Sequence, residues 1–142
     1  MANDHGISVQ IVTPAGDVYN DDGIDIAVLH TRGGQVGVMR QHVPMLAALE
    51  ISELTVKKAG DEAILAVNGG VAEFSNNLLT VVADSAEVSD DIDVTRAKNA
   101  RERAEARLQH AQEVDNTDDL QRARVALMRA INRIHVAAAR QK

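Results

Sequence analysis

The chain of 142 residues contains no cysteine, no tryptophan, and only one phenylalanine and one tyrosine. The absence of cysteine excludes disulfides and thiolate chemistry. Because aromatic rings are nearly absent, the hydrophobic core must be built from Val, Ile, Leu, Ala and Met. The hydrophobic fraction of 45% is ordinary for a soluble protein. The length suits one domain, or a small domain with an appendage.

Long hydrophobic runs are missing as well. No apolar run approaches the roughly 20 residues that are needed to cross a bilayer. The first five residues are polar, with neither the basic start nor the apolar stretch of a signal peptide. We therefore expect a cytoplasmic protein that reaches a membrane only through a partner.

Patterns of catalytic residues are not found either. The five histidines show no metal-ligand spacing, and the serines lie in no nucleophile-elbow pattern. The pairs Gly33-Gly34 and Gly69-Gly70 are not followed by a helix with Lys-Ser/Thr, so we interpret them as turn glycines. The acidic stretch 84–91 is interpreted as a linker before a helix N-terminus, where the helix dipole favours negative charge. We predict a non-catalytic protein without a metal site.

Charge divides the chain into two halves. Residues 1–91 hold 4 of the 15 basic and 14 of the 21 acidic residues, a net charge of −10. Residues 92–142 hold the remaining 11 basic and 7 acidic residues, a net charge of +4. Such an asymmetry between halves indicates two modules with different partners.

The acidic half shows the period-2 alternation of half-buried strands. The alternating apolar positions are Ile7, Val9 and Ile11; Ile24, Ile26 and Val28; Leu54 and Val56; Ile64 and Ala66; Leu79 and Val81. Turn signals separate them at 14–16, 21–23, 33–34, 59–61, 69–70 and 76–77. Many short strands at regular intervals predict an all-β sandwich or barrel. Residues 41–46 break the alternation and are predicted to be the longest irregular connection.

The basic half changes to the period of an amphipathic helix. Two apolar stripes follow that period: Ala97, Ala100, Ala104, Leu108 and Ala111 in the first, and Leu120, Ala123, Leu127, Ile131 and Ile134 in the second. The polar stretch 113–118 separates them, with Asp118 or Thr117 as the expected N-cap of the second helix. Two helices joined by a short polar loop predict an αα-hairpin.

The apolar stripe of the first helix consists mostly of alanine, which buries little area per residue. The hairpin should therefore hold itself together weakly. A weak seam suits an element that opens or redocks. The alternative is a marginal C-terminal appendage with no role in motion.

The arginines of the hairpin follow helical spacing. On the second helix Arg122, Arg129, Arg133 and Arg140 step by 7, 4 and 7, and are expected opposite its apolar stripe. On the first helix, Arg96, Arg103 and Arg107 also align. A solvated helix face is one explanation, but such faces usually mix acids and bases. The stripe favours an acidic protein partner or a phosphate.

The motif Ile92-Asp93-Val94-Thr95-Arg96-Ala97 lies at the break between the halves. Asp93 can cap the helix that follows it, and it lies one turn from Arg96. Arginines would bind phosphate oxygens through paired N–H donors. Asp93 and Glu87 could accept from hydroxyl or amino groups. Helix capping alone would also explain Asp93.

These segments together resemble the epsilon subunits of bacterial F-type ATP synthases. The resemblance covers nearly the whole chain. It rests on Val12-Thr13-Pro14-Ala15-Gly16-Asp17-Val18-Tyr19, Gly34-Gln35-Val36-Gly37, His42-Val43-Pro44-Met45-Leu46, Val67-Asn68-Gly69-Gly70-Val71-Ala72-Glu73 and Asp91-Ile92-Asp93-Val94-Thr95-Arg96-Ala97. The last segment matches the family's Ile/Leu-Asp-x-x-Arg-Ala motif.

The resemblance implies an α+β fold: a ten-stranded β-sandwich over residues 1–88 and an antiparallel two-helix hairpin over residues 89–142. It implies a non-catalytic central-stalk subunit of a proton-translocating synthase, peripheral on the cytoplasmic face of the bacterial membrane. The sandwich would attach to the gamma subunit and the c-subunit ring. The hairpin would regulate ATP hydrolysis, with a folded, ATP-bound state and an extended state that inhibits at the alpha/beta head.

The resemblance also implies roles for individual residues. The ATP-binding positions are Glu87, Ile92, Asp93, Arg96, Ala97, Arg103, Arg129 and Arg133. The contact loop for the c ring and gamma contains Gln35, Val36, His42 and Pro44. The face toward the beta subunits contains Arg122, Arg129, Arg133 and Arg140. ATP as a regulatory ligand is the only cofactor implied.

Two other functions fit parts of the sequence. A stand-alone ATP-sensing module would use the same hairpin site without rotor contacts. A nucleic-acid binder could use the basic hairpin, but the acidic body repels phosphate backbones and the chain lacks aromatic residues for base stacking. We therefore expect no nucleic-acid partner.

Overall fold

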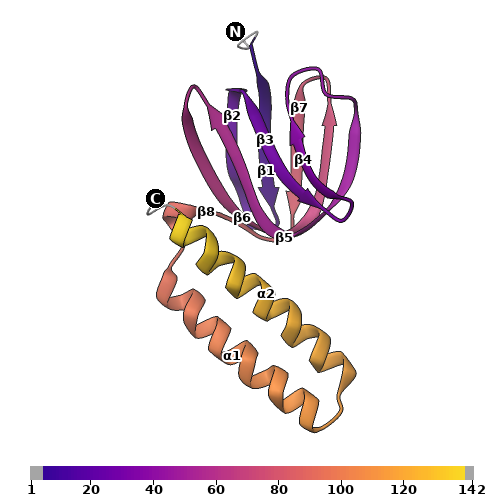
Figure 1. Ribbon diagram of the computed structural model, residues 1–142, viewed down its shortest axis with the longest axis vertical. Coiled ribbons are helices and arrows are strands. Elements are labelled where there is room, and N and C mark those ends of the chain that lie inside the picture. Colours follow the sequence, from indigo (N-terminus) through magenta and orange to yellow (C-terminus); the bar gives the residue numbers. More distant parts are fainter. Residues whose placement is uncertain (1–4, 140–142) are drawn as a thin grey trace.

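The computed structural model describes residues 5–139. A β-sandwich lies at one end of the molecule and a two-helix hairpin at the other (Figure 1). The order of elements is β1 (Ile7–Thr13), β2 (Gly16–Ile24), β3 (Ile26–Thr31), β4 (Gly34–Val38), β5 (Met45–Lys58), β6 (Asp61–Ser75), β7 (Leu78–Ala83), β8 (Ala86–Val88), the 3₁₀ turn η1 (Ser89–Asp91), α1 (Val94–Glu113) and α2 (Thr117–Ala139).

The strands enclose an aliphatic core, as their alternation predicts. Their order is β2-β1-β7-β6-β5-β3-β4, and β8 pairs with β6 outside that path. In β1, Ile7, Val9 and Ile11 are buried while the residues between them are partly exposed. The core has a single large ring, Phe74. Residues 39–44 form the longest connection between elements of the described chain, which confirms the irregular segment expected there.

The described residues form eight strands, not the expected ten. The difference lies in β5 and β6, which have 14 and 15 residues and pair from Lys58↔Asp61 to Met45↔Phe74. The turn expected at Gly69-Gly70 is wrong, because both glycines lie inside β6, at φ of 84° and 130°. One pair, Glu50 with Gly69, is missing from the ladder, and the register is the same on both sides, so the hairpin continues through the glycines without ending. Two long bent strands therefore replace several short ones.

The helices form the predicted hairpin, and alanines line its seam. The buried residues of α1 are Ala97, Ala104 and Ala111, as the first stripe predicts. On α2 the buried residues are Ala123, Ala130, Asn132, Val136 and Ala137. Ile131, predicted on the buried face, is 48% exposed. The smaller Ala130 packs instead, and its neighbour Ile131 lies 100° further round the helix.

The connection between the helices uses backbone caps that composition did not reveal. Asp115 adopts φ 54°, and the Asn116 N–H donates to the Ala111 carbonyl at 3.0 Å, as in a Schellman motif. Asn116 also caps α2, because its side-chain oxygen accepts from the Asp119 N–H at 3.2 Å. The expected cap at Asp118 or Thr117 is therefore wrong by one or two residues, since Asn116 alone has the non-helical geometry that a cap requires.

We predict that Gly70→Ala destabilises the sandwich more than Gly16→Ala. A Cβ at Gly70 would lie 2.2 Å from the Val82 carbonyl oxygen, a backbone atom that cannot move aside. Gly16 has a similar φ of +127° but nothing within 4 Å, so it reports backbone strain alone, about 1–3 kcal/mol. Gly70→Ala should lower the free energy of unfolding by about 2 kcal/mol more. Denaturant unfolding measures both, and equal losses would contradict the bent-strand geometry.

Candidate functional site: the junction of the hairpin and the sandwich

The candidate site is a hollow where the hairpin meets the sandwich. Helix α2 packs against β5, β6 and η1, and α1 lies on its outer side (Figure 1). The hollow has a volume of about 230 Å³. It is lined by Glu87, Asp91, Asp93, Arg96, Ala97, Ala100, Arg103 and Arg133. These residues come from four elements or their ends, so the hollow exists only while the hairpin is docked.

Local structure explains how the wall on α1 forms. Asp93 is the N-cap of α1, and its Oδ1 accepts from the Arg96 N–H at 3.0 Å, which confirms the predicted cap. Arg96 and Arg103 are seven residues apart and therefore share one side of the helix. Ala97 and Ala100 lie between them. Because alanine side chains are short, space remains between the arginines and the sandwich.

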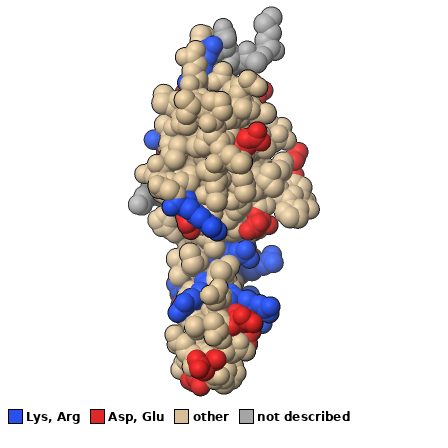
Figure 2. Space-filling model, turned by 90° about the vertical axis from the view of Figure 1, so that its right-hand side faces the viewer, with Lys and Arg blue, Asp and Glu red and all other residues tan. Residues whose placement is uncertain are grey.

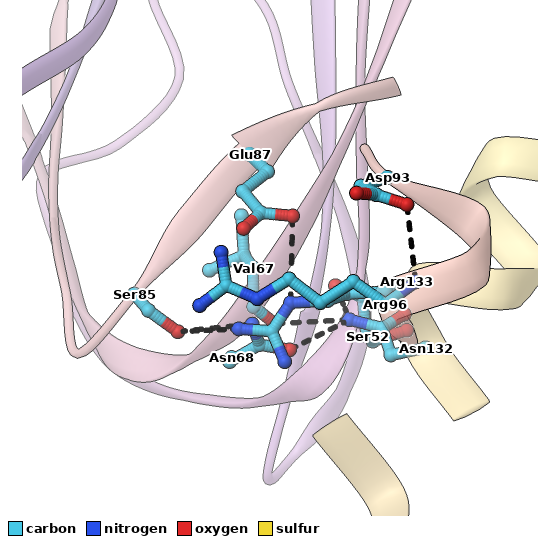
Figure 3. Close-up of polar contacts among 9 residues, drawn as sticks. All are labelled: Ser52, Val67, Asn68, Ser85, Glu87, Asp93, Arg96, Asn132 and Arg133. Atoms are coloured by element: carbon cyan, nitrogen blue, oxygen red, sulfur yellow. Dashed lines mark hydrogen bonds and ion pairs between the residues drawn. The ribbon is translucent and has the colours of Figure 1, made fainter. Parts of the chain in front are cut away.

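Arg133 supplies the wall on α2 and connects it to the sandwich. Its Nε lies 3.4 Å from Glu87 Oε2, and the Arg133 side chain is only 24% exposed. Its Nη2 donates to Ser85 Oγ at 3.5 Å, and Ser85 Oγ also accepts from Asn68 Nδ2 at 3.0 Å. Figure 3 shows Arg133 between Glu87 and Ser85. The hollow thus combines arginines, which suit phosphate oxygens, with carboxylates, which accept from hydroxyl or amino groups.

Six of the eight residues predicted to bind ATP line this one hollow, and two lie beside it. Ile92 is 4% exposed and packs with Val136 and Ala137 under the start of α1. Arg129 Nη2 lies 3.9 Å from Asp84 Oδ2. Its Nε is one of two buried side-chain nitrogens in the described chain without a hydrogen-bond partner. Arg129 is therefore held to the sandwich by one long ion pair.

The predicted arginine stripe of α2 does not form one solvated face here. Arg129 and Arg133 turn toward carboxylates of the sandwich. Arg122 is exposed near the far end of the hairpin, where it lines a larger hollow of about 560 Å³ with Arg107, His110 and Asp119. Arg140 lies outside the described residues. The stripe turns inward because Ala130, not Ile131, marks the side of α2 that faces α1.

Opposite charges face each other across the junction. They are the pairs Arg129–Asp84 and Arg133–Glu87. The His135 ring also contacts the sandwich, with Nε2 3.4 Å from Glu53 Oε2 on β5. Figure 2 shows Lys and Arg side chains gathered on the hairpin next to the sandwich. Basic residues of the hairpin therefore pair with acidic residues of the sandwich within the same molecule. Ion pairs that are this exposed contribute about 0–1 kcal/mol each, so the attraction holds the hairpin without fixing it.

The predicted rotor-contact residues lie on the sandwich. Gln35 and Val36 are in β4, and His42 and Pro44 are in the connection 39–44. The His42 ring contacts the edge of Phe74, with centroids 5.8 Å apart. Sequence reasoning did not single out three exposed apolar side chains in and next to that connection: Met39 at 55%, Val43 at 69% and Leu46 at 75% exposure. The sequence could have identified them, because several apolar residues lie in a segment that is predicted to be irregular.

Asn132 is another residue that sequence reasoning missed. It is 7% exposed, and its side-chain amide donates to the Ser52 carbonyl at 3.0 Å. It is the one polar side chain among the buried residues of the described helices. The sequence feature that could have identified Asn132 is an amide side chain inside the helical segment 129–133, next to Ile131 and Arg133.

The described chain has neither a metal cluster nor a membrane-spanning helix. Within residues 5–139, no three or more His, Asp or Glu side chains are placed to hold a metal ion. The helices of this same range are too polar to cross a bilayer. The fold and the site together define a two-module protein, a β-sandwich that carries a docked, charged two-helix arm.

Comparisons with known proteins identify the family. The profile of the ATP synthase Delta/Epsilon chain β-sandwich domain matches residues 6–89, and that of its long α-helix domain matches residues 90–138. The chain is 56% identical over 135 residues to the ATP synthase epsilon chain of Levilactobacillus brevis, covering 95% of this chain and 96% of the relative. It is 48% identical over 137 residues to that of Pediococcus pentosaceus, covering 96% and 99%.

A solved structure shows the same fold. It is a chain of the Euglena gracilis mitochondrial ATP synthase, in a cryo-EM structure of OSCP/F1/c-ring in rotational state 1. The TM-score is 0.77 at 18% identity, over 98% of this chain and 84% of that one. The present chain therefore belongs to the family of ATP synthase epsilon chains, the non-catalytic central-stalk subunits of F-type ATP synthases.

We predict that the Asp93 side chain stabilises α1 as its N-cap, and that two variants at this position show it. Asp93→Ala removes the cap of α1 and should lower the helical stability of the hairpin by about 1 kcal/mol. Asp93→Asn keeps a capping oxygen, so its cost should be a few tenths of a kcal/mol. Unfolding followed by far-UV circular dichroism measures both. Asp90→Ala, on the exposed 3₁₀ turn, is the control; equal losses in the two Asp93 variants would show that the cap does not stabilise α1.

Proposed function

We propose that this subunit regulates ATP hydrolysis by a hairpin whose folded state is stabilised by ATP in the junction hollow. The observation that carries the proposal is the composition of that hollow. It takes arginines from both helices and carboxylates from the sandwich and the linker. A ligand that contacts all of these parts binds only when they are together, so it shifts the population toward the docked state.

The size of the hollow suits weak, regulatory binding. Ligand pockets usually have volumes of about 300–1,000 Å³, and this one has about 230 Å³. It would therefore enclose only part of a nucleotide and leave the rest in solvent. Arg96, Arg103 and Arg133 would bind phosphate oxygens, with Arg129 joining from beside the hollow. Asp93 and Glu87 would accept from sugar hydroxyls or the base amino group.

The sandwich would attach the subunit to the rotor. Its contact surface would combine Gln35, Val36, His42 and Pro44 with the exposed apolar side chains of Met39, Val43 and Leu46. Exposed apolar side chains that gather in one region mark interaction sites, and the partners would be the gamma subunit and the c ring. The subunit would then lie at the cytoplasmic face of the membrane, held there through the complex that couples proton flow to ATP synthesis.

The extended hairpin would exchange one set of carboxylates for another. When α2 leaves the sandwich, Arg129 and Arg133 lose Asp84 and Glu87. Acidic segments of the beta subunits would replace them, together with contacts to Arg122 and Arg140. Because like interactions replace like, the two states differ little in electrostatic free energy. A weakly bound nucleotide is then sufficient to shift the balance.

We predict that ATP binding depends on the arginines that line the hollow. Arg103→Gln and Arg133→Gln should each weaken ATP binding about tenfold or more, because a charge-assisted contact contributes about 1.5–3 kcal/mol. Isothermal titration calorimetry on the full chain measures this. Arg124→Gln is the matched control, since Arg124 is exposed on α2 and lines no part of the hollow. An unchanged affinity in both variants, or no binding by the parent at millimolar ATP, would reject this site.

We predict that removal of residues 89–142 raises ATP hydrolysis by the assembled synthase. The shortened chain keeps β1–β8 and the rotor-contact loop, so assembly should persist while inhibition is lost. Steady-state hydrolysis at low and high ATP measures the effect. The increase should be larger at low ATP, where the intact hairpin is less often held down. Equal hydrolysis by the full and shortened complexes would contradict a regulatory arm.

A further inference from the structure

One polar side chain fixes the hairpin to the sandwich at a defined register. Asn132 Nδ2 lies 3.0 Å from the Ser52 carbonyl oxygen, 3.4 Å from the Val67 carbonyl oxygen and 3.3 Å from Asn68 Oδ1. Ser52 and Val67 are paired residues of β5 and β6. The amide of one helix residue therefore donates to two neighbouring strands at once (Figure 3).

The acceptors for this amide lie beside the glycine bend of β6. Strand β6 pairs with β7 as far as Gly70↔Ala83 and with β8 from Val67↔Ala86. Asn68 lies between the two partners, at the start of the glycine bend, and is 0% exposed. Between the two partners the backbone bonds continue, from the Asn68 N–H to the Ser85 carbonyl at 2.9 Å and from the Asp84 N–H to the Gly69 carbonyl at 3.2 Å. The bend thus places a buried side-chain amide where α2 docks.

The contacts close into a ring that includes the arginine of the hollow. Asn132 donates to Asn68, Asn68 donates to Ser85 Oγ, and Arg133 donates to that same oxygen. Asn132 and Arg133 are neighbours in the chain, so the ring has no free end. Shifting α2 by one residue would break both bonds that α2 makes to the sandwich in this ring. Asn132 itself does not line the hollow.

We infer that Asn132 is a positioning residue for nucleotide binding: its amide holds α2 in the register that places Arg133 against Ser85 and Glu87. The nucleotide part of this inference rests on the proposed function above. The affinity of the hollow then depends on a residue that the ligand does not touch. If loss of the amide reduces the docked fraction of the hairpin, the apparent dissociation constant rises by the same factor.

Apolar contacts at the junction cannot supply this register. They consist of Ala66, Ile92, Val136 and Ala137, with Ile64 and Val94 packed against them. Apolar contacts are non-directional, whereas hydrogen bonds require a defined distance and angle. The amide, unlike an apolar residue in its place, is also well solvated once the arm leaves. Asn132 therefore suits a contact that must be specific and reversible.

The test compares Asn132→Ala and Asn132→Asp with Ile131→Ala in the full chain. Asn132→Asp keeps the shape of the side chain but places a carboxylate oxygen against the Ser52 and Val67 carbonyl oxygens. If Asn132 acted only through its shape, the Asn132→Asp variant would dock like the parent. Because the chain has no cysteine, spin labels can be attached at Glu73→Cys and Gln121→Cys, both exposed in the parent. Their distance distribution reports docking, and calorimetry reports ATP affinity.

Without nucleotide, we expect both Asn132 variants to show a second, longer distance, with the larger population in Asn132→Asp. ATP affinity should fall in Asn132→Ala by the factor by which the docked fraction falls, at most about tenfold for a loss of roughly 1.4 kcal/mol of docking. Saturating ATP should restore the docked distance in Asn132→Ala, because the binding groups of the hollow are intact. Ile131→Ala should match the parent in both measurements.

Three outcomes test the inference and the proposed function separately. Unchanged distances in both Asn132 variants would overturn the inference, whether or not the parent binds ATP. A parent that does not bind ATP would overturn the proposed function, while the nucleotide-free distances would still test the role of Asn132 in register. A variant that opens but binds ATP with the parent's affinity would show that the register does not position Arg133.

Discussion

The docked state depends on a polar contact of small area between α2 and the bend of β6. The Asn132 amide bonds to both strands of the central hairpin, and the apolar cluster of the junction has only four buried residues. A large apolar contact would hold the helix in place, because each Å² of apolar surface exposed again costs about 25 cal/mol. The hollow and the ion pairs require that this contact forms, whereas the proposed regulatory role requires that it can also be broken.

The junction balances charge as well as packing. Asp84 and Glu87 neutralise arginines that would otherwise remain exposed on an isolated arm. Each pair is partly exposed and therefore weak, and a phosphate or another acidic protein can compete for the same guanidinium groups. The charge difference between the two halves of the sequence thus accounts for the ion pairs between hairpin and sandwich. It also indicates that the groups able to displace these pairs are negatively charged.

The sequence predicts the parts of this molecule that depend on local periodicity. The alternation in β1, the alanine seam of α1 and the cap at Asp93 follow from residues close together in the chain. The strand count, the inward turn of the α2 arginines and the role of Asn132 depend on tertiary packing. A bent strand and two separate strands have the same alternation, and only contact with β6 distinguishes a buried helical amide from an exposed one. The motif at 92–97 locates the hollow, but its other wall comes from α2.

The short neck at η1 and Asp93 makes the arm a lever. Ile92 is buried immediately before α1 begins, so the first fixed point of the arm lies within one residue of the helix. The 20 residues of α1 span about 30 Å, so a rotation of about 10° at the neck displaces the far end by about 5 Å. In the proposed switch, a small rotation beside the sandwich would therefore move the tip by roughly the length of a side chain.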